Sequence, residues 1–264
     1  MGAFEKINLP DIKNIITVAS GKGGVGKSTV SANLAIALAG NGYSVALVDA
    51  DIFGPSIPKM FGIEDAMPEV FEEGEKQLMK PIEKYGVKVM SIGFFVKQNQ
   101  GLIWRGPMAS NALTQLLENT QWGETDYMII DFPPGTSDIQ LTAVQKLTLA
   151  GALIVTTPQE IALNDARKAA SLFSNDNLKV PILGVIENMS WFTPKPHPEE
   201  KYYIFGQGGG ERLANELNVP LIGQIPLIAE VGEAAEKGLS VFSQGDKTAV
   251  EAFDRIVSEL FVKA

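Results

Sequence analysis

The sequence predicts an α/β fold in which helices cover both faces of a mostly parallel sheet. Short β-branched apolar runs alternate with longer runs of helical spacing along the 264 residues. The strand runs are apolar throughout, which is typical of strands that are buried on both faces. Strands separated by helices favour parallel pairing through crossover connections.

The elements can be assigned in order along the chain. The predicted strands are Ile15–Ala19, Val45–Val48, Val87–Ile92, Tyr127–Ile130, Leu153–Thr156, Ile182–Ile186 and Leu221–Ile225. The predicted helices between them are Ser28–Ala39, Ala109–Asn119, Ile139–Leu147, Leu163–Phe173 and Gly210–Leu217. The chain has no internal repeat and no low-complexity linker, so we expect residues 1–264 to form one domain, with residues 1–13 as an N-terminal extension.

Two stretches are predicted to be long surface loops. Ile52–Lys80 is rich in Pro, Gly and Glu, and Ser190–Gly209 has no helical or strand pattern. Long loops in a compact α/β domain are often functional.

A last helix is predicted at Thr248–Val262. Its apolar face consists of Val250, Phe253, Ile256, Val257, Leu260 and Phe261. Such a face either packs on the domain or lies on a membrane. The polar face carries acidic as well as basic side chains, whereas helices at a membrane surface favour Lys and Arg. We therefore expect this helix to be packed.

Composition excludes several classes of function. The net charge of −9 argues against sequence-independent nucleic-acid binding, which relies on a basic surface. The absence of cysteine excludes disulfides, thiol nucleophiles and thiolate metal sites. The N-terminus does not read as a signal peptide, and no apolar run approaches the ~20 residues that span a bilayer. We expect a soluble, cytoplasmic protein with neither nucleic acid nor membrane as a partner.

A phosphate-binding loop follows the first predicted strand. Residues 21–29 read GKGGVGKST and satisfy the pattern G-x-x-x-x-G-K-[ST] between a strand and a helix. Glycines let backbone N–H groups surround phosphates, and the helix N-terminus adds positive potential. We expect Lys27, in an exposed loop, to reach the β- and γ-phosphates of ATP and Ser28 to bind Mg²⁺. The predicted phosphate-binding residues are Gly21, Gly23, Gly24, Val25, Gly26, Lys27, Ser28 and Thr29.

Carboxylates follow two other strands. Asp49 and Asp51 come after Val45–Val48, and Asp131 comes directly after Tyr127–Ile130. The carboxyl ends of parallel strands meet at the ligand-binding edge of a sheet, where carboxylates suit Mg²⁺ and its waters. We assign Asp131 to the magnesium shell and Asp51 to the orientation or deprotonation of the attacking water. Asp49 suits either role.

The loop sequence GKGGVGKS resembles the deviant phosphate-binding loop of the MinD/ParA/nitrogenase iron protein class of P-loop NTPases. That resemblance implies a homodimer in which Lys22 crosses the interface to the partner's phosphates. Together with Lys27 and Asp51, Lys22 completes the predicted catalytic set.

Several further segments resemble the Mrp/ApbC branch of that class. They are Ile103–Ser110 (IWRGPMAS), Asp131–Thr142 (DFPPGTSDIQLT), Thr156–Lys168 (TTPQEIALNDARK), Gly184–Ser190 (GVIENMS) and Ile204–Ala214 (IFGQGGGERLA). Members of this branch are treated as iron–sulfur cluster carrier or scaffold ATPases. The resemblance implies that Asn188 contacts the adenine base and that Pro226 and Leu227 form part of its pocket.

The sequence also departs from that family. Its members usually carry a Cys-x-x-Cys shortly after the Asn-Met-Ser segment, where two subunits can share a cluster through four thiolates. Here residues 191–197 read WFTPKPH, and neither Lys195 nor His197 replaces those thiolates. Many members also begin with a small additional domain that is absent from this sequence. An iron–sulfur cluster is therefore implied by the family but not supported by this chain.

The leading hypothesis is a homodimeric, Mg²⁺-dependent ATPase that serves iron–sulfur client or scaffold proteins. One alternative is a MinD- or ParA-type switch that uses ATP to time binding to a membrane or to DNA. Another is a transferase or kinase that acts on a small molecule. The switch would require a basic amphipathic tail or basic surface patches, and the sequence shows neither.

Overall fold

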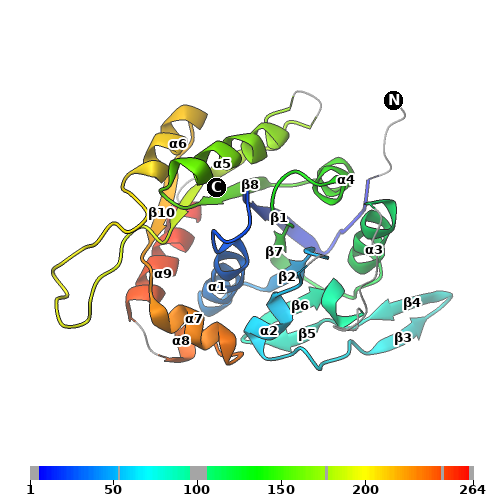
Figure 1. The fold of residues 1–264 in the computed structure, drawn as a ribbon. Helices are drawn as coiled ribbons and strands as arrows, with labels where there is room; N and C mark the ends of the chain where they lie inside the picture. The colour runs from blue at the N-terminus through cyan, green and yellow to red at the C-terminus, as the bar shows by residue number, and fades with distance from the viewer. Residues whose placement is uncertain (1–5, 53, 96–105, 176–177, 245–246, 262–264) are drawn as a thin grey trace.

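The structure is a computed structural model that describes residues 6–52, 54–95, 106–175, 178–244 and 247–261. Within these ranges the chain forms an eight-stranded sheet in the order β10-β9-β8-β1-β7-β2-β6-β5 (Figure 1). The strands are β1 (Ile12–Ala19), β2 (Val45–Asp49), β5 (Ile82–Lys84), β6 (Val87–Ser91), β7 (Thr125–Asp131), β8 (Gly151–Thr156), β9 (Ile182–Asn188) and β10 (Leu221–Ile225). All neighbours pair in parallel except β5, which is antiparallel to β6. The predicted α/β fold class is confirmed.

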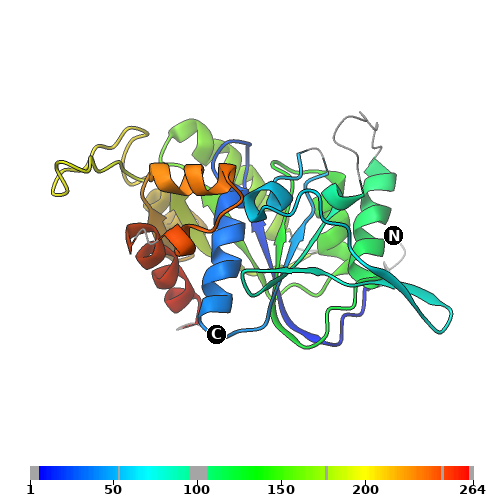
Figure 2. The ribbon, with the colours of Figure 1, turned by 90° about the horizontal axis from the view of Figure 1, so that it is seen from below.

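The helices are α1 (Lys27–Gly40), α2 (Ile57–Phe61), α3 (Gly106–Glu118), α4 (Asp138–Lys146), α5 (Glu160–Phe173), α6 (Gly209–Leu217), α7 (Ala229–Glu236), α8 (Val241–Gln244) and α9 (Lys247–Phe261). They cover both faces of the sheet, as Figure 2 shows from below. Buried apolar residues of α3, α4 and α6 and most of those of α5 belong to one core cluster, and those of α1, α2 and α9 belong to another. Successive strand residues alternate between the two, so Met128 and Ile130 lie in the first and Ile129 in the second. This alternation explains why the strands are apolar at every position.

The prediction of the first of the two surface loops is partly wrong. Ile52–Lys80 contains α2 and a two-stranded hairpin of β3 (Val70–Glu73) and β4 (Lys76–Met79). Ile57 and Phe61 of α2 are buried, so part of this stretch belongs to the core. The prediction also missed β5, α7 and α8.

The second predicted loop remains irregular. Between β9 and α6, residues 191–208, here called the arm, hold only an isolated bridge between Phe192 and Tyr202. The arm extends away from the body in both views, at the end opposite the β3–β4 hairpin (Figures 1 and 2).

The two ends of the described chain pack on the domain. Ile7 is buried in the core, and its N–H donates to the carbonyl oxygen of Lys146 (2.8 Å). In α9, Phe253, Ile256 and Val257 are buried in the cluster that also holds α1. The apolar face of this helix is therefore covered, as expected of a packed helix. No described helix is long and apolar enough to cross a membrane. Val262, the predicted last residue of the helix, lies outside the described residues, as do Ile103–Arg105.

Candidate nucleotide-binding site

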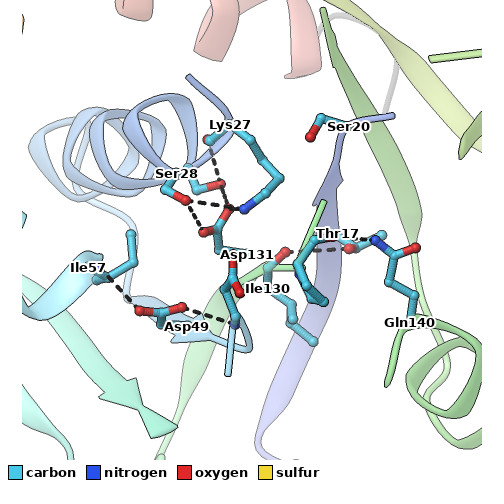
Figure 3. A network of polar contacts seen from close by, with 12 residues as sticks. Thr17, Ser20, Lys27, Ser28, Asp49, Ile57, Ile130, Asp131 and Gln140 are labelled. Carbon is cyan, nitrogen blue, oxygen red and sulfur yellow. Dashed lines mark hydrogen bonds and ion pairs between the residues drawn. The ribbon is translucent and has the colours of Figure 1, made fainter. Parts of the chain in front are cut away.

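The predicted site residues meet at the carboxyl edge of the sheet. Val18 of β1 and Asp49 of β2 are both register partners of Asp131 at the end of β7. The loop after β1 leads directly into α1, whose first turn stands over Asp131 (Figure 3). Parallel pairing alone therefore brings the loop and the two carboxylates together.

At two positions of the loop the structure requires glycine, each for a different reason. A Cβ at Gly21 would lie 1.9 Å from the backbone carbon of Asp165, so the loop can touch α5 only without a side chain there. Gly26 has a φ of +81°, and a Cβ there would lie 2.2 Å from Nδ2 of Asn188. Both residues serve close packing as well as the phosphate approach that the motif predicts. Between them, Gly23 and Gly24 are exposed and Val25 is buried.

Lys27 is not in an exposed loop, and that expectation is wrong. It is the first residue of α1, and only 6% of its side chain is exposed. Its Nζ lies 2.8 Å from Oδ1 of Asp131, which is fully buried. The side chain turns inward because the carboxylate at the end of β7 is the nearest opposite charge.

Asp131 accepts two further hydrogen bonds from α1. Oγ of Ser28 donates to Oδ2 (2.6 Å), and Oγ of Ser31 donates to Oδ1 (2.6 Å). Figure 3 shows the side chains of Lys27 and Ser28 converging on this carboxylate. The sequence motif predicted Ser28 but not Ser31. Ser31 lies within a buried helix, and a polar residue on such a helix was the only available signal.

The turn after Asp131 is tied to the phosphate-binding loop. The N–H of Gly135 donates to the carbonyl oxygen of Ser20 (2.9 Å). The amide of Gln140 donates to the carbonyl oxygen of Pro133 (2.5 Å). Among the described residues, Oε1 of Gln140 is the one buried side-chain nitrogen or oxygen atom without a hydrogen-bond partner. These contacts hold the end of β7 against the loop.

Asp49 points into the protein rather than toward solvent. It is fully buried, and its oxygens accept hydrogen bonds from the N–H of Asp51 (3.1 Å), the N–H of Ile57 (3.2 Å) and Oγ of Ser91 (3.1 Å). Burial and the negative charge of Asp131 raise the pKa of Asp49 to about 7. Asp49 therefore holds the segment that carries Asp51, which is itself half-buried.

The residues predicted for the base line one cavity of about 150 Å³. Asn188 lies at the end of β9, and its Nδ2 donates to the carbonyl oxygen of Val25 (2.9 Å). Pro226 and Leu227 form another wall, and Gly26 and Thr29 of the loop and first turn complete this part of the lining. The structure thus brings the predicted base-binding and phosphate-binding residues together.

Lys22 is half-buried in the loop, and Oγ of Ser20 donates to its carbonyl oxygen (3.0 Å). The predicted contact of Lys22 is with a second subunit, so a single chain does not contain it.

The arm begins and ends beside a buried carboxylate that the sequence analysis did not single out. Glu187 of β9 accepts from the N–H of Gly210 (2.5 Å) and from Nε2 of Gln224 (2.7 Å). Its carbonyl oxygen accepts from Oγ of Ser190 (2.9 Å). Both roots of the arm are therefore fixed through one residue, adjacent to Asn188.

The arm itself is largely exposed and carries charged side chains as well as apolar ones such as Tyr203 and Ile204. Nζ of Lys201 lies 4.0 Å from the centre of the Trp191 ring, and Lys195 pairs with Glu230. His197 is 58% exposed and lies within 4.0 Å of Glu199 and Glu200. Carboxylates are hard donors and an imidazole is a borderline one, whereas clusters are held chiefly by soft thiolates. The donors of the arm therefore do not fit an iron–sulfur cluster.

The family is decided by a match over almost the whole chain. A ParA-group family model described as "NUBPL iron-transfer P-loop NTPase" matches residues 11–261. The chain belongs to this family. The resemblance to the Mrp/ApbC and MinD/ParA proteins is confirmed, and this member of the NUBPL family contains no cysteine.

Curated relatives support the same placement. An iron-sulfur cluster carrier protein of Synechocystis is 44% identical over 260 residues, which cover 96% of this chain and 73% of that protein. One of Aquifex aeolicus is 47% identical over 259 residues, covering 97% and 70%. This NUBPL-type chain is thus similar to iron–sulfur cluster carriers over nearly its full length.

Solved structures agree with the fold. A nucleotide-binding protein from Archaeoglobus fulgidus, solved in complex with ADP, has a TM-score of 0.74 at 37% identity and covers 86% of this chain and 87% of its own. The cell division ATPase MinD of Pyrococcus furiosus has a TM-score of 0.65 at 23% identity and covers 95% and 99%. At that identity the second likeness concerns the fold alone.

Proposed function

We propose that this NUBPL-family member is a homodimeric, Mg²⁺-dependent ATPase that acts on iron–sulfur clusters held by another protein or domain. The observation that carries the proposal is the convergence of Lys27, Ser28 and Asp131 beside the cavity of Asn188. The ADP complex of the Archaeoglobus relative supports a nucleotide in the same place.

The donors at the end of β7 fit Mg²⁺. The hydroxyl of Ser28 and the carboxylate of Asp131 are oxygen ligands, lie 2.6 Å apart and stand at a helix N-terminus where phosphates bind. A bound Mg²⁺ would neutralise charge on the β- and γ-phosphates. Two of the three donors to Asp49 are backbone N–H groups of the segment after β2, whereas the donors to Asp131 are side chains, so we assign Asp49 to holding the loop and not to direct ligation.

Each remaining residue has one proposed task. Lys27 exchanges its ion pair with Asp131 for the phosphates of ATP. Asp51 orients the attacking water, and Lys22 reaches the phosphates of the partner subunit. Fixed charges aimed at the transferring group are the usual source of rate in phosphoryl transfer.

Calorimetric titration of ATP and ADP, with and without Mg²⁺, tests the nucleotide part. We expect tight binding that weakens in EDTA and a slow release of phosphate from ATP. Undetectable ATP binding in the presence of Mg²⁺ would refute the proposal. Lys22→Ala should retain ATP binding in the monomer and lose hydrolysis, because its proposed contact lies across the dimer interface.

The cluster part has a separate test. Because the chain offers no thiolate, we expect no stable cluster after anaerobic reconstitution with iron and sulfide, desalting and optical absorption. A relative with a Cys-x-x-Cys in its arm is the positive control. A stoichiometric chromophore in this chain would contradict the proposal and direct attention to His197, Glu199 and Glu200.

A further inference from the structure

Ser31 is the donor to Asp131 that belongs to no recognised motif. It lies one turn beyond Lys27 in α1 and is fully buried. Its Oγ is 2.6 Å from Oδ1 of Asp131 and 3.1 Å from the carbonyl oxygen of Lys27. A hydroxyl has one proton, and the nearer, charged acceptor binds it more strongly.

The three donors to Asp131 differ in what else they do. Lys27 and Ser28 are the two residues that the proposed function assigns to phosphate and Mg²⁺. Both must redirect a donor toward the ligand when nucleotide binds. Ser31 has no ligand to bind, since its side chain is fully buried and lies one turn beyond the phosphate-binding loop.

A buried carboxylate that loses two donors at once needs the third. Without a fixed donor, the carboxylate can rotate away from the orientation in which it faces Mg²⁺, because hydrogen bonds from neighbouring groups are what orient a ligating carboxylate. A hydroxyl fixed on Oδ1 opposes that rotation.

We propose that Ser31 is a positioning residue that keeps Asp131 oriented while Lys27 and Ser28 engage the nucleotide and Mg²⁺. The inference rests on the proposed function, which it deepens: Ser31 controls how strongly Mg²⁺ supports nucleotide binding. It touches neither ligand itself.

The experiment measures the affinity for ADP by calorimetry over a series of Mg²⁺ concentrations and in EDTA. In Ser31→Ala we expect the Mg²⁺ concentration for half-maximal effect to rise roughly tenfold, as expected for loss of a hydrogen bond to a charged group. The affinity for ADP in EDTA should be unchanged. Ser31→Cys replaces the hydroxyl with a weak donor of similar shape and should show the same defect, whereas Ser31→Thr should behave like the wild type.

Asn33→Ala is the matched control. Asn33 lies on the same helix, is mostly buried and donates to the carbonyl oxygen of Thr29 (2.9 Å). Its substitution removes a comparable helix contact and should leave the Mg²⁺ response unchanged.

Three results of these titrations would contradict the proposed role of Ser31. An unchanged Mg²⁺ response in Ser31→Ala, or in Ser31→Cys if the alanine variant does not fold, overturns the inference. Equal weakening of ADP binding with and without Mg²⁺ also overturns it, since that pattern indicates a structural role. A wild-type protein whose affinity for ADP ignores Mg²⁺ would instead refute the proposed function, and the inference with it.

Discussion

The nucleotide site and the arm both lie at the carboxyl edge of the sheet, yet their polar contacts differ in burial. At the site, the ion pair of Lys27 and Asp131 is buried, and each oxygen of that carboxylate has a donor. In the arm, Lys195 is 84% exposed and His197 is 58% exposed. Buried pairs are costly to break, whereas exposed pairs contribute little. The difference teaches that the polar contacts of the phosphate-binding loop are buried and paired, whereas those of the arm are exposed to solvent.

The largest expected difference between the two regions is in hydrolysis. Asp51→Asn should bind ATP nearly as the wild type does and hydrolyse it about 10²–10⁴-fold more slowly, because it loses the charge that orients water. His197→Ala, the arm counterpart, should leave the rate unchanged. Single-turnover assays would measure both. An unchanged rate in Asp51→Asn would remove Asp51 from the mechanism.

A second difference is in stability. Lys27→Ala should abolish ATP binding and also lower the free energy of unfolding by about 3–5 kcal/mol, because it leaves a buried carboxylate without its counter-ion. Lys195→Ala should cost less than about 1 kcal/mol. Denaturant titrations of the two variants test the comparison directly. Equal effects would mean that the buried pair is no more important than the exposed one.

The pH dependence of stability sharpens the comparison at one residue. The pKa of Asp49 is about 7, whereas that of an unfolded aspartic acid is about 3.9. The folded state therefore retains a proton between these values, and the resulting stabilisation is complete below the lower pKa and lost as the pH rises through 7. Asp49→Asn stays neutral, so relative to the wild type it should gain up to ~1.4 kcal/mol per pH unit across this window. Any cost of the altered hydrogen bonds is independent of pH, and parallel profiles would contradict the shift.

The smallest expected effect is in the arm. Lys201→Ala removes an exposed contact with the Trp191 ring and should change the free energy of unfolding by about 0.5–1 kcal/mol at most. ATP affinity should not change. A large loss of stability, measured in the same titrations, would show that the arm is part of the core structure.

The sequence predicted those parts of the molecule that depend on local patterns. The phosphate-binding loop is a contiguous motif, and buried parallel strands carry continuous apolar runs, so Asp49 and Asp131 could be placed at one edge from strand ends alone. Asn188 and Leu227 came from the family resemblance, and the structure places both in one cavity.

What the sequence did not predict depends on contacts between distant residues or on short elements. Ser31 meets Asp131 across 100 residues of chain, and no local pattern marks that contact. The inward turn of Lys27 has the same origin. Strand β5 has three residues, and the β3–β4 hairpin is largely exposed, so neither has a buried face that periodicity could reveal.

The anchoring of the arm has a consequence for how such proteins diversify. Its roots are held by Glu187 and by the backbone of Ser190, whose N–H donates to the carbonyl oxygen of Ile225 (2.9 Å). None of these bonds uses a side chain between Trp191 and Gly208, so substitutions of those side chains leave the anchoring bonds in place. We therefore expect point substitutions in the arm to introduce metal ligands without disturbing the contacts of Asp131. A cysteine-bearing segment inserted between Ser190 and Gly209 would be anchored by the same hydrogen bonds at its two ends.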